Sequence, residues 1–433
     1  MSLTTLNPLY PDKQSNNHNA LCWGQLHGCS QDLLIANASS EFKGLIVLVT
    51  PDSQSAYEAE TNIRFFCSEL NTQKSESAIH IFPDWETLPY DVFSPHEDLI
   101  SDRLKTLHQL SHIKNGVLIV PVATLMQKLA PVDYIRNNTL ILNVGDSLEI
   151  DTMRQQLESS GYRHVTQVME HGEYSTRGSL IDLFPMGSNT PFRIDLFGDE
   201  IETIRSFNPE DQRTIEQLNK IELLPAHEYP LTPDGISLFK ENYSTQIGGD
   251  LAHSQIYDNV VNGNPPTGIE YYLPLFFKST ATLFDYLPEK VLLINAEGTQ
   301  AAAETFYATV MDRHEQRRHD LERPILAPEL LYLNSDQLLS KIEGMRRINT
   351  HSFKQTKNCH NYPVNTLPSL LIQARAETPL MLLKQFLQQI QIHEQRGRIL
   401  FTADSAGRRE NLIGLLRDNG FTTHTTDNWH SFI

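Results

Sequence analysis

The stretch Leu45-Ile-Val-Leu-Val49-Thr50-Pro51 decides the fold class of this 433-residue chain. Five consecutive apolar residues that stop at a Thr-Pro pair are typical of a strand covered on both faces of a parallel sheet. Two further runs share this character, at residues 78–82 and 116–120. Helical patterns at residues 53–70 and 98–113 alternate with these runs. The alternation predicts an α/β domain built on a parallel sheet.

A different pattern follows in residues 141–225. A short helix is expected at residues 151–160 because Gly161, a residue type that often ends helices, comes next. Strand-like segments at residues 191–197 and 201–205 then flank a Gly-Asp pair, which predicts a β-hairpin. This region is therefore expected to fold as a small α+β domain.

The α/β pattern returns in residues 226–350. A buried-type strand is expected at residues 291–295, followed by a helix at about 299–314. The polar stretch at residues 349–368 is interpreted as a linker.

The fourth region, residues 351–433, is expected to be a small α/β domain. The apolar run at residues 399–403 predicts a strand, and Ser405 is expected to cap a helix at 406–418. One more short strand is expected before Ile433. We expect this domain to be incomplete and the chain to be an N-terminal fragment of a longer protein.

The composition indicates a multidomain globular chain. Hydrophobic residues make up 39%, enough for buried cores, and no stretch reaches the ~20 apolar residues of a membrane span. The first 13 residues lack the pattern of a secretory signal. Four cysteines without a CxxC pair argue against a disulfide scaffold or a zinc knuckle. A cytoplasmic location is therefore expected.

The charge is distributed unevenly along the chain. Residues 313–433 contain 16 Lys+Arg and 12 Asp+Glu, whereas residues 1–312 contain 19 and 41, a net charge of −22. An acidic surface repels the phosphate backbone, which disfavours direct DNA binding by residues 1–312. A DNA-binding module that uses the basic stretch at residues 313–323 stays open as an alternative.

The sequence contains no intact phosphate loop. Such a loop needs glycines, a Lys for the β/γ-phosphates and a Ser or Thr for magnesium, and neither GKS nor GKT occurs. The nearest candidate is His27-Gly28-Cys29-Ser30-Gln31-Asp32, which carries Gln31 and Asp32 at the critical positions. Asp32 would set a negative charge against phosphate. We predict no cofactor for this chain, and retained nucleotide binding is an alternative.

No catalytic residue and no metal site are predicted. The stretch His314-Glu-Gln-Arg-Arg-His319 is one residue too long for the zinc-binding HExxH spacing. His108 and His112 have the spacing of two ligands on a helix, but no Glu lies between them. Ordinary polar helix faces explain both patterns.

The first strand of the predicted hairpin, residues 191–197, presents an unusual outer face. A period of two places Ile194 and Leu196 in the core, and Arg193, Asp195 and Phe197 on the other face. Arginines and aromatic residues supply many of the energetically dominant contacts of interfaces. The face is therefore a candidate docking surface. Alternatively, Phe197 packs under a neighbouring domain while Arg193 pairs with Asp195.

Residues 170–185 and 193–200 resemble domain 2 of UvrB, the helicase-like protein of nucleotide-excision repair, and the equivalent domain of the bacterial transcription-repair coupling factors, Mfd. Gly268-Ile-Glu-Tyr-Tyr272 is similar to GIENY of UvrB, and Leu292-Leu-Ile-Asn-Ala-Glu-Gly298 to its LLIIDES. The run at residues 82–96 is closer to Mfd and too short for the DNA-gripping hairpin of UvrB. The resemblance covers about residues 20–420.

The resemblance implies a degenerate RecA/helicase-like domain that is split by an insertion. Residues 1–140 correspond to domain 1a, 141–225 to domain 2 and 226–350 to domain 1b, before the small domain at 351–433. The stretch at residues 27–33 falls where UvrB has TGSGKTF. The degenerate nucleotide site would comprise Gly28, Gln31, Asp32, Asn295 and Glu297.

The resemblance also implies the partners. In the family, domain 2 docks onto UvrA, and the matching residues here are Arg177, Arg193 and Phe197. Mfd is an ATP-driven DNA translocase that removes stalled RNA polymerase. Its motor, with ATP and magnesium, and its polymerase-binding region would lie beyond Ile433, as would the C-terminal domain that masks domain 2. This chain would then be a non-catalytic module that mimics UvrB and recruits UvrA to polymerase stalled at DNA lesions.

Overall fold

The computed structural model describes residues 20–67, 79–248, 254–356, 358–370, 379–393, 398–403 and 405–433. The N-terminal 13 residues, residues 68–70 of the predicted helix and residue 78 of the predicted strand lie outside the described residues. No helix among the described residues is long and apolar enough to cross a membrane.

The core is a seven-stranded sheet with the order β15-β1-β14-β13-β2-β4-β3, and every neighbouring pair in it is parallel. Its strands are β1 (Ala20–Gly24), β2 (Leu45–Thr50), β3 (Ile79–Ile81), β4 (Gly116–Pro121), β13 (Val291–Asn295), β14 (Arg347–Thr350) and β15 (His360–Asn361). All residues of β2 and β4 are buried, as strands between two helical layers must be. The predicted parallel α/β core is confirmed.

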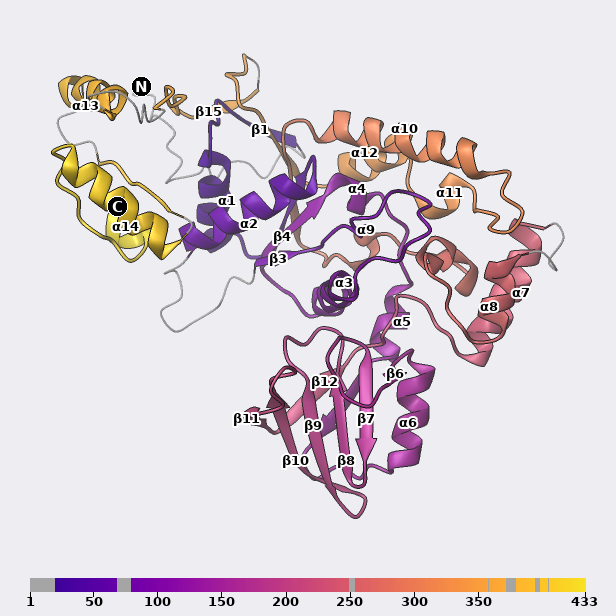
Figure 1. Ribbon diagram of the computed structural model, residues 1–433. Coiled ribbons are helices and arrows are strands. Elements are labelled where there is room, and N and C mark those ends of the chain that lie inside the picture. Colours follow the sequence, from indigo (N-terminus) through magenta and orange to yellow (C-terminus); the bar gives the residue numbers. More distant parts are fainter. Residues whose placement is uncertain are drawn as a thin grey trace.

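Helices cover both faces of this sheet (Figure 1). One face packs against α1 (Ser30–Glu41) and α2 (Ser53–Cys67), through Leu34 and Ile63 among others. The other face packs against α3 (Glu97–Leu110), α4 (Val122–Leu125), α10 (Thr299–Arg317) and α12 (Ser335–Glu343). Because β2 is buried on both sides, its successive residues alternate between the two clusters.

A second, six-stranded sheet forms the small domain at the bottom of Figure 1, with the order β11-β10-β9-β8-β7-β6. Its strands are β6 (Arg163–His164), β7 (Glu173–Arg177), β8 (Leu180–Phe184), β9 (Phe192–Phe197), β10 (Glu200–Phe207) and β11 (Thr214–Leu218). Apart from the β6–β7 pair, neighbouring strands are antiparallel. Helix α6 (Ile150–Ser159) buries Met153 and Leu157 in the core cluster that contains the inward side chains of this sheet. The predicted inserted α+β fold is confirmed.

The chain enters and leaves this domain through two paired strands. β5 (Leu140–Asn143) and β12 (Lys220–Leu223) form a separate two-stranded antiparallel sheet. Their pairing sets the two crossings of the chain side by side. The predicted domain boundaries themselves stay predictions.

The segment between β12 and β13 forms a helical layer with a tyrosine-rich core. Its elements, with the short helix α5 that precedes β5, are α5 (Val132–Asn137), α7 (Pro233–Gln246), α8 (Gln255–Val261), the 3-10 helix η2 (Ile269–Phe276) and α9 (Leu283–Tyr286). Phe239, Tyr243, Tyr272 and Phe276 are each almost fully buried there, together with α11 (Pro328–Leu331).

The interpretation of residues 349–368 as a linker is wrong for residues 349–350 and 360–361, which belong to strands of the large sheet. β14 extends to Thr350, and β15 pairs in parallel with β1 at the edge of the large sheet. A disulfide between Cys22 and Cys359 joins the same two segments. The two-residue β15 has no apolar pattern of its own, and it is a strand only because it pairs with β1.

The described elements after β15 are helices. They are α13 (Met381–His393), α14 (Ala406–Asp418) and α15 (Trp429–Phe432). The predicted strands at residues 399–403 and before Ile433 are wrong, since neither stretch has strand pairing. A strand needs a partner for its backbone groups, and the described neighbours are helices. The cap is as predicted: Ser405 Oγ accepts from the Arg408 N–H at 3.2 Å.

Candidate functional site

The predicted degenerate nucleotide site lies at the carboxyl edge of the large sheet. Gly28 belongs to the loop between β1 and α1, and Gln31 and Asp32 lie in the first turn of α1. Asn295 ends β13, and Glu297 follows it. In open parallel sheets this edge is where ligands bind. The structure thus brings the five residues to the expected edge.

The last residue of β14 and the segment after it contact this edge from within the chain. Thr350 Oγ1 donates to Gln31 Oε1, and the Ser352 N–H donates to Glu297 Oε2 at 2.9 Å. The Ser352 hydroxyl donates to the same carboxylate oxygen. Backbone N–H groups of residues 25 and 26 donate to the carbonyls of residues 353 and 351. Gln31 and Glu297 therefore already have partners within the chain.

Asp32 is buried and turned towards a neighbouring helix. Its Oδ2 accepts from Asn62 Nδ2 of α2 at 2.7 Å, and its exposure is 7%. Burial raises the pKa of Asp32 to about 6, while the hydrogen bonds from Asn62 and Gln31 act in the opposite direction. A buried carboxylate at this position adds negative charge where a phosphate-binding site needs positive charge.

Asn295 and Gly28 complete the edge. The Asn295 Oδ1 is buried and accepts no hydrogen bond in the described part of the chain. Gly28 has a φ of +57°, which glycine adopts readily. Among the described residues no group of three or more His, Cys, Asp or Glu side chains is placed to hold a metal ion.

The second candidate site is the outer face of the small domain's sheet. Ile194 and Leu196 of β9 are buried, while Phe197 at the end of the strand is 79% exposed. The antiparallel register sets Asp182 opposite Arg193, and Leu180 opposite both Arg177 and Asp195. Residues opposite each other project to the same face. The structure therefore places Arg177, Arg193 and Phe197 on one face.

Two glycine turns bring Arg177 and Phe197 to the same end of the sheet. Gly178 and Gly198 follow the two residues with φ of +61° and +65°. The Leu196 N–H donates to the Ser179 carbonyl at 3.0 Å, and this hydrogen bond links the turn between β7 and β8 to strand β9. Sequence periodicity alone could not place the Arg177 side chain, whereas the strand register does.

Arg193 is held by a cross-strand ion pair. Its Nε donates to Asp182 Oδ1 at 2.7 Å and its Nη2 to Asp182 Oδ2 at 2.9 Å. The guanidinium lies over the Phe207 ring, 4.8 Å from its centre. The pairing of Arg193 with Asp195 that sequence reasoning offered as an alternative is wrong, because Asp195 binds Arg205 and Thr203 instead.

Sequence reasoning missed Asp182 and Arg205, which make this face an ordered ion-pair network. Only the strand register reveals these ion pairs, because Asp182 and Arg205 lie on β8 and β10, the two strands next to β9. Arg177 donates to the Thr166 carbonyl and is otherwise exposed. The face thus combines fixed charges with one uncovered aromatic ring. The alternative that Phe197 packs under a neighbouring domain is wrong for the described residues.

Comparison with known proteins identifies the family. The sequence pattern of the UvrB interaction domain matches residues 140–229, and that of the Mfd D3 domain matches residues 383–433. The transcription-repair-coupling factor of Haemophilus influenzae is 43% identical over 93% of this chain, and that of Escherichia coli is 41% identical over 91%. This chain carries the UvrB-homology region of the transcription-repair coupling factors.

The match to the coupling factors covers only part of those proteins. The chain spans about a third of the length of the curated relatives, 34% and 33% for the two named. A more distant coupling factor, from Rickettsia bellii, is 29% identical over 73% of the chain. The matched UvrB interaction domain includes the face that carries Arg177, Arg193 and Phe197.

Proposed function

We propose that this chain is a non-catalytic docking module that mimics UvrB and binds UvrA through the outer face of its small domain. By doing so it recruits UvrA to RNA polymerase stalled at DNA lesions, in transcription-coupled nucleotide-excision repair. The observation that carries the proposal is Phe197, which is 79% exposed in a segment that matches the UvrB interaction domain.

The roles of the three residues differ in this proposal. Phe197 is the apolar anchor, since its ring is free to enter a pocket on UvrA. Arg177 supplies a charge at the rim for a carboxylate of the partner. Arg193 is committed to Asp182 and acts mainly by ordering the strand face.

The remaining partners belong to the parts of the coupling factors that this chain does not cover. The resemblance implies that RNA polymerase, DNA, ATP and magnesium bind in those parts, and that a C-terminal domain covers the outer face at rest. In this arrangement the chain works in the cytoplasm and contributes no chemistry of its own.

Retained nucleotide binding is the alternative from the enzyme class. The contacts of Gln31, Asp32 and Glu297 within the chain disfavour it. Titration calorimetry of the chain with Mg-ATP tests it, and we expect no saturable heat. Clear saturable binding would support the alternative and contradict the interpretation of this edge as a degenerate nucleotide site.

Direct DNA binding through residues 313–323 is the other alternative. Two of the cations in this stretch are already used: Arg313 Nε donates to the Pro89 carbonyl at 2.5 Å, and Arg318 pairs with Glu315 at 3.0 Å. Saturable DNA binding that weakens steeply with salt would support this alternative. We expect none at physiological salt.

Capture of the chain by immobilised UvrA tests the docking proposal. We expect the wild-type chain to be retained and the Arg177→Ala/Phe197→Ala double variant to be lost. Ile215→Ala is the matched control, because Ile215 is a large apolar residue on β11 of the same sheet and is 57% exposed. Equal retention of all three folded chains would contradict the site assignment.

A further inference from the structure

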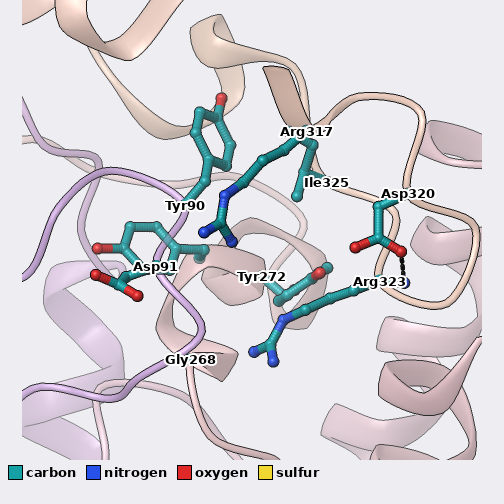
Figure 2. Close-up of a pocket in the computed structure, with 9 residues that line it drawn as sticks. Tyr90, Asp91, Gly268, Tyr272, Arg317, Asp320, Arg323 and Ile325 are labelled. Atoms are coloured by element: carbon teal, nitrogen blue, oxygen red, sulfur yellow. Dashed lines mark hydrogen bonds between the residues drawn. The ribbon is translucent and has the colours of Figure 1, made fainter. Parts of the chain in front are cut away.

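Two polar junctions outside the candidate sites join segments that are far apart in the sequence. The first lies between the end of α10 and the loop at residues 88–92 (Figure 2), where Arg317 and Arg323 are matched by Asp91 and Asp320. Its formal charge is balanced, so it favours neither an anion nor a cation. The second is the seam between α3 of the body and the small domain, where one histidine lies among carboxyl groups.

The seam follows one side of α3, the helix that lies next to the small domain in Figure 1. Asp98, Ser101 and Lys105 of this helix contact the small domain. The Gly187 N–H donates to Ser101 Oγ at 2.8 Å, and Lys105 Nζ donates to Asn189 Oδ1 at 3.2 Å. Side chains spaced three and four residues apart share one side of a helix. The seam therefore orients the small domain on the body.

His171 of the small domain makes the third contact of the seam. Its Nδ1 lies 2.7 Å from Asp98 Oδ1, and its Nε2 lies 2.8 Å from the Ser188 carbonyl oxygen. The side chain is 13% exposed, and its ring centre lies 4.1 Å from that of Phe184. The imidazole is thus held between α3 and the loop that joins β8 to β9.

These two contacts fix the number of protons on the imidazole. A carbonyl oxygen can only accept a hydrogen bond, so Nε2 must carry a proton. An ionised carboxylate also only accepts, so Nδ1 must carry a proton as well. The Asp98 side chain is largely exposed, and a carboxylic acid is far more acidic than an imidazolium, so the proton stays on the ring. His171 is therefore a cation when both contacts are made.

The carboxyl groups on α3 favour this cation. Glu97 and Asp102 lie on either side of Asp98 along the helix and interact electrostatically with His171. Burial raises the pKa of both carboxyl groups, and the His171 charge acts against both shifts.

The other cations near the seam do not replace the imidazolium. Arg163 of the small domain lies 3.5 Å from Glu170 and 3.7 Å from Glu173. Lys105 is directed to Asn189 instead. The His96 Nδ1 accepts from the Asp98 N–H at 3.2 Å, so this nitrogen supplies no proton to the carboxylate.

We propose that His171 is a proton-dependent latch that holds the small domain against α3 and loosens when the imidazole loses its proton. A neutral imidazole carries one N–H, so either the Asp98 contact or the Ser188 contact is then lost. The latched state therefore binds one more proton than the released state. It follows that latching weakens as pH rises through the titration of the imidazole.

Amide hydrogen exchange of the whole chain, followed by NMR, tests the latch. The reporter is the Gly187 N–H, which donates across the seam, and the reference is the Leu196 N–H, which donates to Ser179 within the small domain. Exchange is measured from about pH 5 to about pH 9, on either side of the ordinary imidazole value of ~6.5, and divided by the intrinsic rate at each pH. We expect the protection of Gly187 to fall about tenfold across this range, while that of Leu196 stays constant.

Three variants separate the latch from general stability. His171→Gln carries no titratable proton, so the protection of Gly187 should be low at every pH. Asp98→Asn keeps an acceptor but loses the negative charge, so release should begin at a lower pH than in the wild type. His164→Gln is the matched control, since His164 is an exposed histidine of the same domain, and it should keep the wild-type profile.

Three results would overturn the proposal. The first is a Gly187 protection that does not change with pH in the wild type. The second is a wild-type profile in His171→Gln or Asp98→Asn. The third is a loss of protection at Leu196 together with Gly187, which would indicate unfolding of the small domain rather than release of the seam.

Discussion

Asp32 is a carboxylate that the fold removes from water. Its pKa is raised by burial to about 6, whereas an aspartate in an unfolded chain titrates near ~4. Between these two values the folded chain holds a proton that the unfolded chain has released. The free energy of unfolding therefore falls as pH rises through this window, and the loss is complete above it.

Asp32→Asn should remove this loss. The amide retains an acceptor for Asn62 but carries no charge, so we expect the free energy of unfolding at pH 7.5 to rise by up to about 3 kcal/mol. Urea unfolding between pH 4.5 and 7.5 measures it, with Asp336→Asn at an exposed position of α12 as control. An unchanged pH dependence in the Asp32 variant would contradict the assignment.

Arg193 shows why single residues are hard to assign from a sequence. Two residues along a strand are about 6.7 Å apart, whereas residues directly opposite on neighbouring strands are about 5 Å apart. Asp182 is opposite Arg193 and outcompetes Asp195 for it. The alternation of β9 predicted the face correctly, but the ion pairs depend on a register that no local pattern encodes.

At the scale of elements, the strands that could be predicted are those with their own apolar pattern. β2, β4 and β13 are continuous apolar runs buried between helices. β15 could not be predicted, because its two residues become a strand only by pairing with β1. The run at residues 399–403 fails in the opposite way, since it has a strand-like pattern but no described strand to pair with.

A buried ion pair ties helix α3 to the chain that returns from the small domain. Arg103 Nε lies 2.6 Å from Glu228 Oε1, and both side chains are almost fully buried. Arg103 Nη1 also donates to the Pro83 carbonyl at 2.9 Å. Removing one partner of such a pair leaves an uncompensated charge in the interior.

Arg103→Met should therefore lower the free energy of unfolding by about 3–5 kcal/mol. The Arg103→Met/Glu228→Met double variant should recover part of this loss, because neither charge is then left alone. Chemical unfolding measures both. Arg136→Met is the control, since Arg136 pairs with Asp133 at the surface, and its effect should stay within about 1 kcal/mol. A similar cost for Arg103→Met and Arg136→Met would refute the interpretation.

On the scale of the whole molecule, the small domain stands apart from the body. β5 and β12 carry the chain out and back, so the outer sheet face can meet a partner while the large sheet stays intact (Figure 1). The short helix α15 packs on the body instead, where the Trp429 ring lies 5.0 Å from that of Phe66 on α2. This division suits a protein that presents a docking surface on a rigid scaffold.

The acidic charge of residues 1–312 fits the same account. A body with a net charge of −22 in this range is suited to binding a protein rather than a nucleic-acid backbone. The parallel sheet and the small α+β domain were predictable from apolar runs and the hairpin turn. The contact of Thr350 with Gln31 at the nucleotide edge was not, since it joins residues 319 positions apart.

The dissociation constant of the chain and purified UvrA, for wild type and for Phe197→Ala, tests the central claim most directly. Phe197 is exposed, so the substitution should leave the unfolding midpoint unchanged. We predict that it weakens UvrA binding by at least about 30-fold, or about 2 kcal/mol, while Ile215→Ala binds as the wild type does. Phe197→Ala that binds UvrA within twofold of the wild type would contradict the account.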